Sequence, residues 1–170
     1  MASFDTYAPR LRKWEGSKFV CDPDDYGGAT NGGVTLDTFK MVFGQDKTVE
    51  DLKNMTDAQW RTVMKGNFWD KCKADLIKNQ SVAEIFVDWC INAGIEKIKF
   101  VQNMVGTDTD GIVGPKTIAA INAADQARLH RSIKLARARR FLNQIEANPA
   151  SQMKFFNGWF NRLIDFTYPK

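Results

Sequence analysis

The sequence contains few of the side chains on which metal and thiol chemistry depend. Its 170 residues include one histidine, His130, and three cysteines, Cys21, Cys72 and Cys90, with no Cys-x-x-Cys spacing. One histidine cannot complete the ligand set of a structural zinc site, and a cysteine or serine nucleophile would need it as a base. We therefore expect no metal, no cofactor and three reduced, mostly buried thiols. If the protein is an enzyme, its chemistry belongs to carboxylates.

Long apolar runs are also missing. No segment approaches the roughly 18 consecutive apolar residues of a membrane-spanning helix, and the mean hydropathy is -0.38. Residues 1–5 do not join a basic region to an apolar one, so we expect no conventional signal peptide. The composition is that of a globular domain, with 44% hydrophobic residues, 26% charged residues and a net charge of +4. It excludes intrinsic disorder, collagen-like repeats and a disulfide scaffold.

The spacing of apolar residues predicts helices along most of the chain. Phe4, Tyr7, Leu11 and Trp14 recur every three or four residues, as on one face of a helix that Gly16 can close. The same spacing predicts further helices over residues 56–69, 81–93, 116–122, 125–146 and 153–166. No alternating strand pattern runs beyond a few residues. We predict an all-α class, mainly α with a small β-hairpin.

Local signals refine these helices. Thr56 is a suitable N-cap for one of them, and Ser81 with Glu84 forms a capping box that would open another. Within residues 125–146, coiled-coil-like spacing predicts an inward stripe of Leu135, Ala138, Leu142 and Ile145.

Two turn-rich segments interrupt the helices, at residues 17–35 and 106–115. The first contains an Asn31-Gly32 pair, which suits a type I′ hairpin turn. Because no low-complexity linker separates the halves, we expect one compact body with two helical lobes, residues 1–85 and 86–170.

Carboxylates in unlike surroundings lie close together near the N-terminus. Glu15 ends the first predicted helix beside Trp14, where the helix dipole and an apolar neighbour both disfavour its charged form. Asp25 follows in a polar loop, and Thr30 lies beside the predicted hairpin turn, where its hydroxyl could orient a water molecule. Glycoside hydrolysis uses such a pair of carboxyl groups. The alternative is that Glu15 is a surface residue and Asp25 a turn former.

The acidic loop also has a weak similarity to a calcium site. Asp22, Asp24 and Gly27 match positions 1, 3 and 6 of an EF-hand loop. The match fails where charge is most needed, because Tyr26 and Gly33 would occupy positions 5 and 12. We therefore expect no calcium site.

Several motifs resemble the glycoside hydrolase family 108 muramidases, which are phage-type, lysozyme-like enzymes. The most specific block begins Glu15-Gly16-Ser17 and continues through Asp25, Thr30-Asn31 and Gly33-Val34-Thr35. Further similarity lies at residues 68–70, 86–94 and 158–162, and in a peptidoglycan-binding-type region at 101–104 and 110–117. The motifs cover most of the chain in family order.

The resemblance implies a lysozyme-like helical fold and cleavage of the β-1,4 bond between N-acetylmuramic acid and N-acetylglucosamine in peptidoglycan. Glu15 matches the catalytic glutamate of the family, and Asp25 with Thr30 would complete a catalytic set. We expect Glu15 to protonate the glycosidic oxygen while the other two hold a water molecule, in a single displacement with inversion.

The sequence also departs from the family pattern at three positions. Ser17 replaces a glycine, Tyr26 replaces a proline, and Gly32 stands where an aromatic residue is common. None of these changes removes a catalytic group. We expect substrate contacts from Tyr26 and Asn31, on the loop, and from Asn92.

One predicted helix is strongly basic. Its cations are Arg128, Arg131, Lys134, Arg137, Arg139 and Arg140. They form a solvated face, or intramolecular ion pairs, or a surface attracted to anionic cell-wall polymers or lipid headgroups. No nucleic-acid-binding module accompanies the charge, so we expect no nucleic-acid partner.

Two functional classes follow from these features. The first is an active muramidase, phage-derived or a bacterial wall-remodelling enzyme, that acts on peptidoglycan glycan strands as a monomer. The second is a wall-binding or secretion-assisting protein that keeps the fold, as in relatives called secretion activators. Either would be made in the cytoplasm and would act at the cell wall, in the periplasm or outside the cell, after release.

Overall fold

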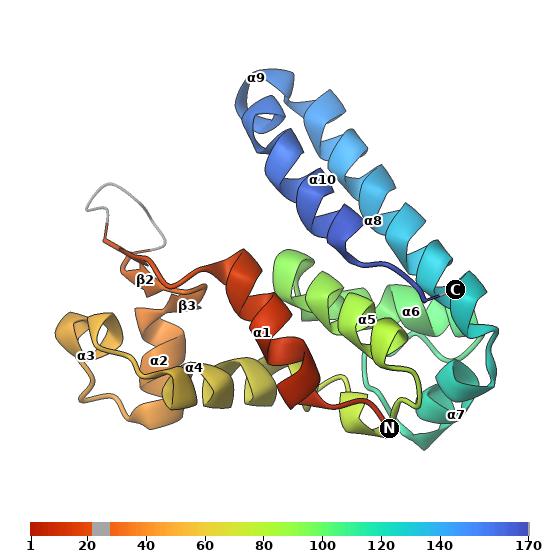
Figure 1. Cartoon of the computed structure of the whole chain (residues 1–170), viewed down its shortest axis with the longest axis horizontal. Helices are drawn as coiled ribbons and strands as arrows, with labels where there is room; N and C mark the ends of the chain where they lie inside the picture. The colour runs from red at the N-terminus through yellow and green to blue at the C-terminus, as the bar shows by residue number, and fades with distance from the viewer. Residues whose placement is uncertain (22–27, 170) are drawn as a thin grey trace. The chain divides into compact units, whose positions relative to one another are not determined.

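The computed structural model describes residues 1–21 and 28–169, and the predicted mainly α class is confirmed (Figure 1). Contacts divide the chain into two compact units. The N-terminal unit is Phe4–Asp70, and the C-terminal unit comprises Met1–Ser3 and the chain from Lys71 onward. The predicted lobe boundary after residue 85 would fall inside helix α5 (Gln80–Ala93). Within the described residues, no helix is long and apolar enough to cross a membrane.

Helix α1 (Phe4–Glu15) opens the N-terminal unit with the predicted inward face. Phe4, Tyr7 and Leu11 are buried along it. The helix ends at Gly16, whose backbone N–H donates to Arg12 O at 2.9 Å and whose φ is +71°. This left-handed conformation favours glycine, which is why the chain can leave the helix here.

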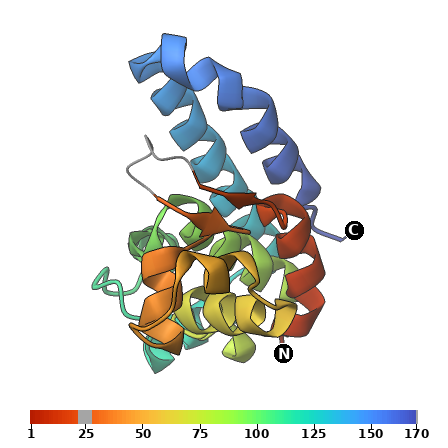
Figure 2. The same ribbon diagram turned by 90° about the vertical axis from the view of Figure 1, so that its left-hand side faces the viewer.

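The predicted hairpin is confirmed as part of a three-stranded antiparallel sheet in the order β1 (Phe19–Val20), β2 (Thr30–Asn31), β3 (Val34–Thr35) (Figure 2). Its turn lies one residue later than expected, because Asn31 pairs with Val34 and leaves Gly32 and Gly33 as the central residues. Both glycines have positive φ, +53° and +78°. A type I′ turn needs that conformation at both central positions.

Short helices complete the N-terminal unit: α2 (Leu36–Phe43), α3 (Val49–Lys53), α4 (Asp57–Met64) and the π-helical η1 (Lys65–Trp69). Thr56 caps α4 as predicted, and Gln59 completes a capping box. Trp60 and Trp69 are fully buried, and Trp69 stacks on Tyr7 with ring centroids 5.9 Å apart. The aromatic side chains of α1, α4 and η1 therefore form the core of this unit.

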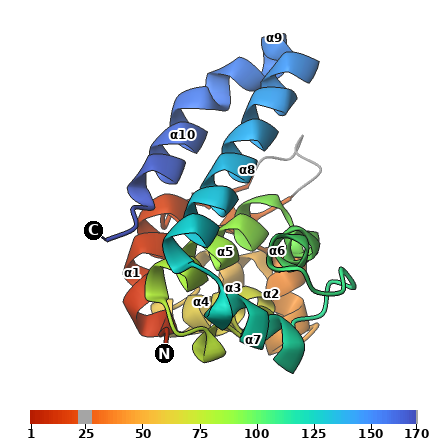
Figure 3. The same cartoon turned by 90° about the vertical axis from the view of Figure 1, so that its right-hand side faces the viewer.

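The C-terminal unit is built on α5, followed by α6 (Ile98–Val105), α7 (Pro115–Ala123), α8 (Gln126–Ala147) and α10 (Phe156–Asp165). Short turns lie between them at η2 (Ala74–Leu76), η3 (Ile95–Lys97), α9 (Pro149–Gln152) and η4 (Met153–Phe155). Helices α8 and α10 lie side by side and are joined through α9 (Figures 1 and 3). The predicted Ser81 cap is wrong, because Asn79 is the N-cap and accepts from the N–H of Val82.

The inward stripe of α8 also differs from the prediction. Leu135 and Leu142 are 64% and 44% exposed, so of the predicted stripe only Ile145 is buried in the core. His130 is buried as well, and the other buried residues of α8 recur at every fourth position: Leu129, Ile133, Arg137, Phe141 and Ile145. Because an arginine occupies the middle of this stripe, the spacing of apolar residues alone does not reveal the stripe.

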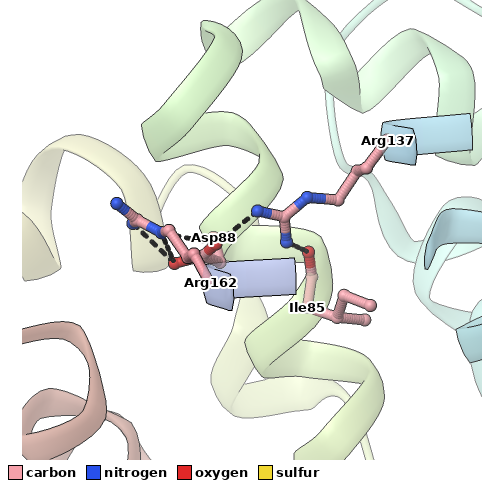
Figure 4. Close-up of polar contacts among 4 residues, drawn as sticks. All are labelled: Ile85, Asp88, Arg137 and Arg162. Carbon is pink, nitrogen blue, oxygen red and sulfur yellow. Dashed lines mark hydrogen bonds and ion pairs between the residues drawn. The ribbon is translucent and has the colours of Figure 1, made fainter. Parts of the chain in front are cut away.

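That arginine belongs to a buried charge cluster (Figure 4). Asp88 on α5 is fully buried and accepts hydrogen bonds from Arg137 of α8 at 2.6 Å and from Arg162 of α10 at 2.7 Å. Burial alone would raise the pKa of Asp88, but the two guanidinium charges and their hydrogen bonds outweigh it and hold that pKa below its ordinary value. One carboxylate thus joins three helices.

A buried glutamine organises the loop between α6 and α7. Gln102 donates to Asp110 Oδ1 at 2.7 Å and to Ile112 O at 3.0 Å, and it accepts from the N–H of Gly111 at 2.9 Å. The backbone N–H of Ile112 and the Gln102 amide hold the pKa of Asp110 below its ordinary value. The two motifs of the predicted peptidoglycan-binding-type region, 101–104 and 110–117, therefore meet in one network.

Candidate active site

Glu15 is half-buried at the C-terminal end of α1, where its carboxyl group lies against the hairpin turn. A Cβ placed on Gly33 would clash with Glu15 Oε2 and would lie 3.3 Å from Met64 Cε. Gly33 therefore lets the polypeptide backbone approach the carboxyl group more closely than any other residue would allow. The carboxyl group has backbone on one side and apolar side chain nearby.

The turn is fixed by one hydrogen bond to its backbone and two from the side chain of Asn31. Trp60 Nε1–H donates to Gly32 O at 2.9 Å in a buried contact. Asn31 Nδ2 donates to Leu52 O at 2.9 Å and to Lys53 O at 3.1 Å, which ties β2 to α3. These bonds hold the turn from α3 and α4, so the position of Gly33 relative to Glu15 is built by three elements together.

Gly32 is packed as tightly as Gly33. A Cβ at this position would lie 2.5 Å from Arg12 Nη1, 3.0 Å from Gly16 O and 3.3 Å from Trp60 Nε1. The larger side chain that is common here in the family would displace the Arg12 guanidinium and would crowd Gly16 O. A glycine at position 32 therefore suits the space that Arg12, Gly16 and Trp60 leave for it.

Arg12 was absent from the predicted set, although it lies beside the turn. Its guanidinium carbon lies 4.7 Å from the centre of the Trp60 ring, and its Nη1 is buried without a hydrogen-bond partner among the described residues. The arginine precedes Glu15 by one helical turn, which is the signal that could have revealed it. It places a cation against Gly32, next to the glycine that the Glu15 carboxyl group contacts.

The other predicted site residues differ in burial and in the unit to which they belong, and some lie outside the described residues. Thr30 is half-buried on β2, two residues before Gly32, whereas Asn31 is buried and its amide is committed to α3. Asp25 and Tyr26 lie outside the described residues, as do Asp22 and Asp24 of the calcium comparison. Asn92 belongs to α5 in the C-terminal unit, and its buried Oδ1 has no hydrogen-bond partner in the described part of the chain.

The thiols divide into one exposed and two buried groups. Cys21 is exposed, while Cys72 and Cys90 are buried with their Sγ atoms 3.8 Å apart. The hydrogen bond to Cys90, together with burial, raises the pKa of Cys72 well above its ordinary value. A thiol held in its protonated form is a poor nucleophile. Across residues 1–21 and 28–169, no group of three or more His, Cys, Asp or Glu side chains could hold a metal ion.

Comparisons with known proteins agree with the family resemblance. Residues 96–164 match the model described as Predicted Peptidoglycan domain, and residues 8–94, half of the chain, match the model described as Glycosyl hydrolase 108. Among solved structures, SagA of Brucella abortus is similar, with 28% identity and a TM-score of 0.76 over 96% of this chain and 92% of that chain. No curated protein matches. The chain belongs to the glycosyl hydrolase 108 family.

Proposed function

We propose that the protein is an N-acetylmuramidase that cleaves the β-1,4 bond between N-acetylmuramic acid and N-acetylglucosamine in peptidoglycan. The observation that carries this proposal is the carboxyl group of Glu15, half-buried at the end of α1 and held against Gly33 of the hairpin. A general acid needs a fixed position and surroundings that favour its protonated form. The end of α1 and the close approach of the Gly33 backbone supply the fixed position.

In this proposal Glu15 donates its proton to the glycosidic oxygen as the bond to the muramic acid carbon breaks. Asp25 and Thr30 hold a water molecule on the opposite face of the sugar ring, and Asp25 accepts its proton as the oxygen attacks. The product is a reducing N-acetylmuramic acid of inverted configuration, and Glu15 is reprotonated from solvent. Tyr26 and Asn92 are proposed to contact the substrate, whereas the buried Asn31 is proposed to act through the hairpin, which it ties to α3.

The match of residues 96–164 to a peptidoglycan domain supports peptidoglycan as the binding partner of the C-terminal unit. We therefore propose that the protein acts at the cell wall. The N-terminal unit would then hydrolyse the same polymer that the C-terminal unit binds.

The test is the release of reducing ends from purified peptidoglycan. After borohydride reduction, wild-type digestion should yield muramitol, whereas Glu15→Gln should lower the initial rate by a factor on the order of 10²–10⁴ because the general acid is lost. Glu50→Gln is the matched control: Glu50 is an exposed glutamate of α3, and its removal should leave the rate unchanged.

Equal rates for Glu15→Gln and wild type would remove Glu15 from the mechanism. If neither protein produced muramitol while both bound sacculi, the wall-binding or secretion-assisting alternative would replace the enzyme. The anomeric configuration of the first product, followed by proton NMR, tests inversion separately. A β-anomer would show retention and give Asp25 the role of nucleophile.

A further inference from the structure

The C-terminal unit contains an open groove of about 770 Å³ between α5, α6 and α8. Its floor and walls are largely apolar and aromatic, formed by Trp89, Phe100, Met104, Leu135 and Ala136. Phe100 is 51% exposed and stacks obliquely on Trp89 with ring centroids 5.5 Å apart. The volume is that of a site for a small ligand.

Cationic side chains line the same groove. Lys97, Arg139 and Arg140 all contribute to its lining. Lys97 is paired with Glu96 at 3.0 Å, and Arg140 donates to Gln144 at 3.0 Å, whereas Arg139 is exposed. With the neighbouring Glu96 included, the groove keeps a positive excess. An anionic ligand with apolar parts would complement both its walls and its charge.

A buried donor in the groove lining is also unused. Trp89 is almost completely buried, yet its Nε1–H has no hydrogen-bond partner among the described residues. Leaving such a donor unpaired is unfavourable, and native structures rarely do so without a reason. The Nε1 atom is itself closed to solvent, so this N–H is not one of the groups that the open groove presents to a ligand.

We propose that this groove binds the stem peptide of peptidoglycan through the carboxylates of that peptide. This inference rests on the proposed action on peptidoglycan. The stem peptide combines free carboxylates with alanine methyl groups, which match the arginines and the apolar walls in turn. In peptidoglycan the lactyl carboxyl group of N-acetylmuramic acid is tied up in the amide bond to the stem peptide, so the free carboxylates that Arg139 and Arg140 would complement belong to the peptide. The C-terminal unit would thus recognise the peptide, while the N-terminal unit cleaves the sugar chain.

The direct experiment is calorimetric titration of the full-length protein with N-acetylmuramyl-L-alanyl-γ-D-glutamyl-meso-diaminopimelate. This compound has no β-1,4 bond between sugars, so binding is measured without turnover. The wild-type protein should bind it, and neutral chitotetraose should not compete. Arg139→Glu should weaken binding roughly tenfold or more, because it replaces a charge-assisted hydrogen bond by repulsion.

Matched variants on the same unit serve as controls. Arg131→Glu makes the same charge change on an exposed arginine of α8 outside the groove lining, and affinity should stay within about twofold of wild type because salt screens distant surface charges. Phe100→Ala should also weaken binding, whereas Phe155→Ala, at a comparably exposed phenylalanine, should not. Circular dichroism confirms that each variant is folded.

Equal losses for Arg139→Glu and Arg131→Glu, or no binding by the wild-type protein, would overturn the proposal. Binding to phosphatidylglycerol vesicles in place of the muramyl peptide would also overturn it and assign the groove to a membrane surface. The outcome is separable from the proposed function. A protein that binds the muramyl peptide but releases no muramitol contradicts hydrolysis alone, and one that releases muramitol without binding the peptide contradicts the groove alone.

Discussion

The two units position their key groups by different physical means. In the N-terminal unit, the Glu15 carboxyl group is placed by backbone: Gly33 packs against it, and Gly32 O is held by Trp60. In the C-terminal unit, three helices are aligned by charged side chains, with Asp88 between Arg137 and Arg162. The glycine contact brings backbone close to the Glu15 carboxyl group, whereas the buried charges determine which helices pack together.

This difference predicts different kinds of failure. A lost buried charge partner leaves the remaining charges without compensation, so it acts mainly on the stability of the whole unit. An added methyl group at a glycine turn acts locally, on the geometry of the carboxyl group that the glycine contacts. Stability and activity should therefore respond separately to changes in the two regions.

The largest expected effect on stability comes from Asp88→Ala. Two guanidinium groups would lose their carboxylate in a buried environment, and the free energy of unfolding should fall by about 3–5 kcal/mol. Urea denaturation measures this change. Asp57→Ala removes an exposed carboxylate 2.7 Å from Arg61 and should cost less than about 1 kcal/mol. Similar losses for both variants would contradict the special role of the buried cluster.

The pH dependence of stability, compared between wild type and Asp88→Ala, tests whether the lost stability comes from the Asp88 carboxylate. Because the folded-state pKa of Asp88 lies below its ordinary value of about 3.9, its contribution is present above that value and is lost as the pH falls through the folded pKa. The difference in unfolding free energy between wild type and Asp88→Ala should be constant from neutral pH down to about pH 4 and should shrink only below it. A difference that faded between pH 7 and pH 5 would point to another group.

A smaller effect on stability and a larger one on activity are expected from Gly33→Ala. The added methyl group would clash with Glu15 Oε2 at a φ of +78°, so stability should fall by about 2–3 kcal/mol. Displacement of the carboxyl group should lower kcat for muramitol release roughly 10-fold or more.

Gly106→Ala is the matched control for that prediction. Gly106 has a similar φ of +72°, but no atom of the described residues lies within 4 Å of an added Cβ. This variant should lose only about 1–2 kcal/mol from the backbone conformation and should keep its kcat. If Gly33→Ala kept its kcat as well, the close approach to Glu15 would have no catalytic meaning.

Local signals in the sequence predicted much of the N-terminal unit. Gly16 ends α1, Thr56 caps α4 and a hairpin forms as predicted, with its turn one residue later than the predicted Asn31-Gly32, because each of these features depends on a few neighbouring residues. The position of Glu15 at a helix end made it a candidate and the resemblance to the family strengthened it, and the structure adds how Gly33 and Trp60 surround it. Those contacts join residues 18 and 28 positions apart, so no local pattern contains them.

The C-terminal unit was harder to predict for a related reason. Asn79, not Ser81, caps α5, because the side chain that reaches the N–H of Val82 comes from the earlier residue. The stripe on α8 was assigned to Leu135 and Leu142, which are exposed, because Arg137 was counted among the solvated cations. Its burial depends on Asp88, 49 residues earlier, and only the tertiary structure brings the two together.

The smallest effects concern two buried tryptophans that differ in one hydrogen bond. Trp60→Phe removes the donor to Gly32 O and leaves that carbonyl unpaired, so stability should fall by about 1–3 kcal/mol. Trp89→Phe removes an indole N–H without a partner in the described chain, so the loss on that account should be close to zero. Thermal unfolding of both variants tests the contrast. A loss for Trp89→Phe as large as that for Trp60→Phe would mean that the Trp89 N–H has a partner in the folded protein. A clear difference would show that the N-terminal unit gains stability from pairing its indole N–H, whereas the C-terminal unit leaves the equivalent group unpaired among the described residues.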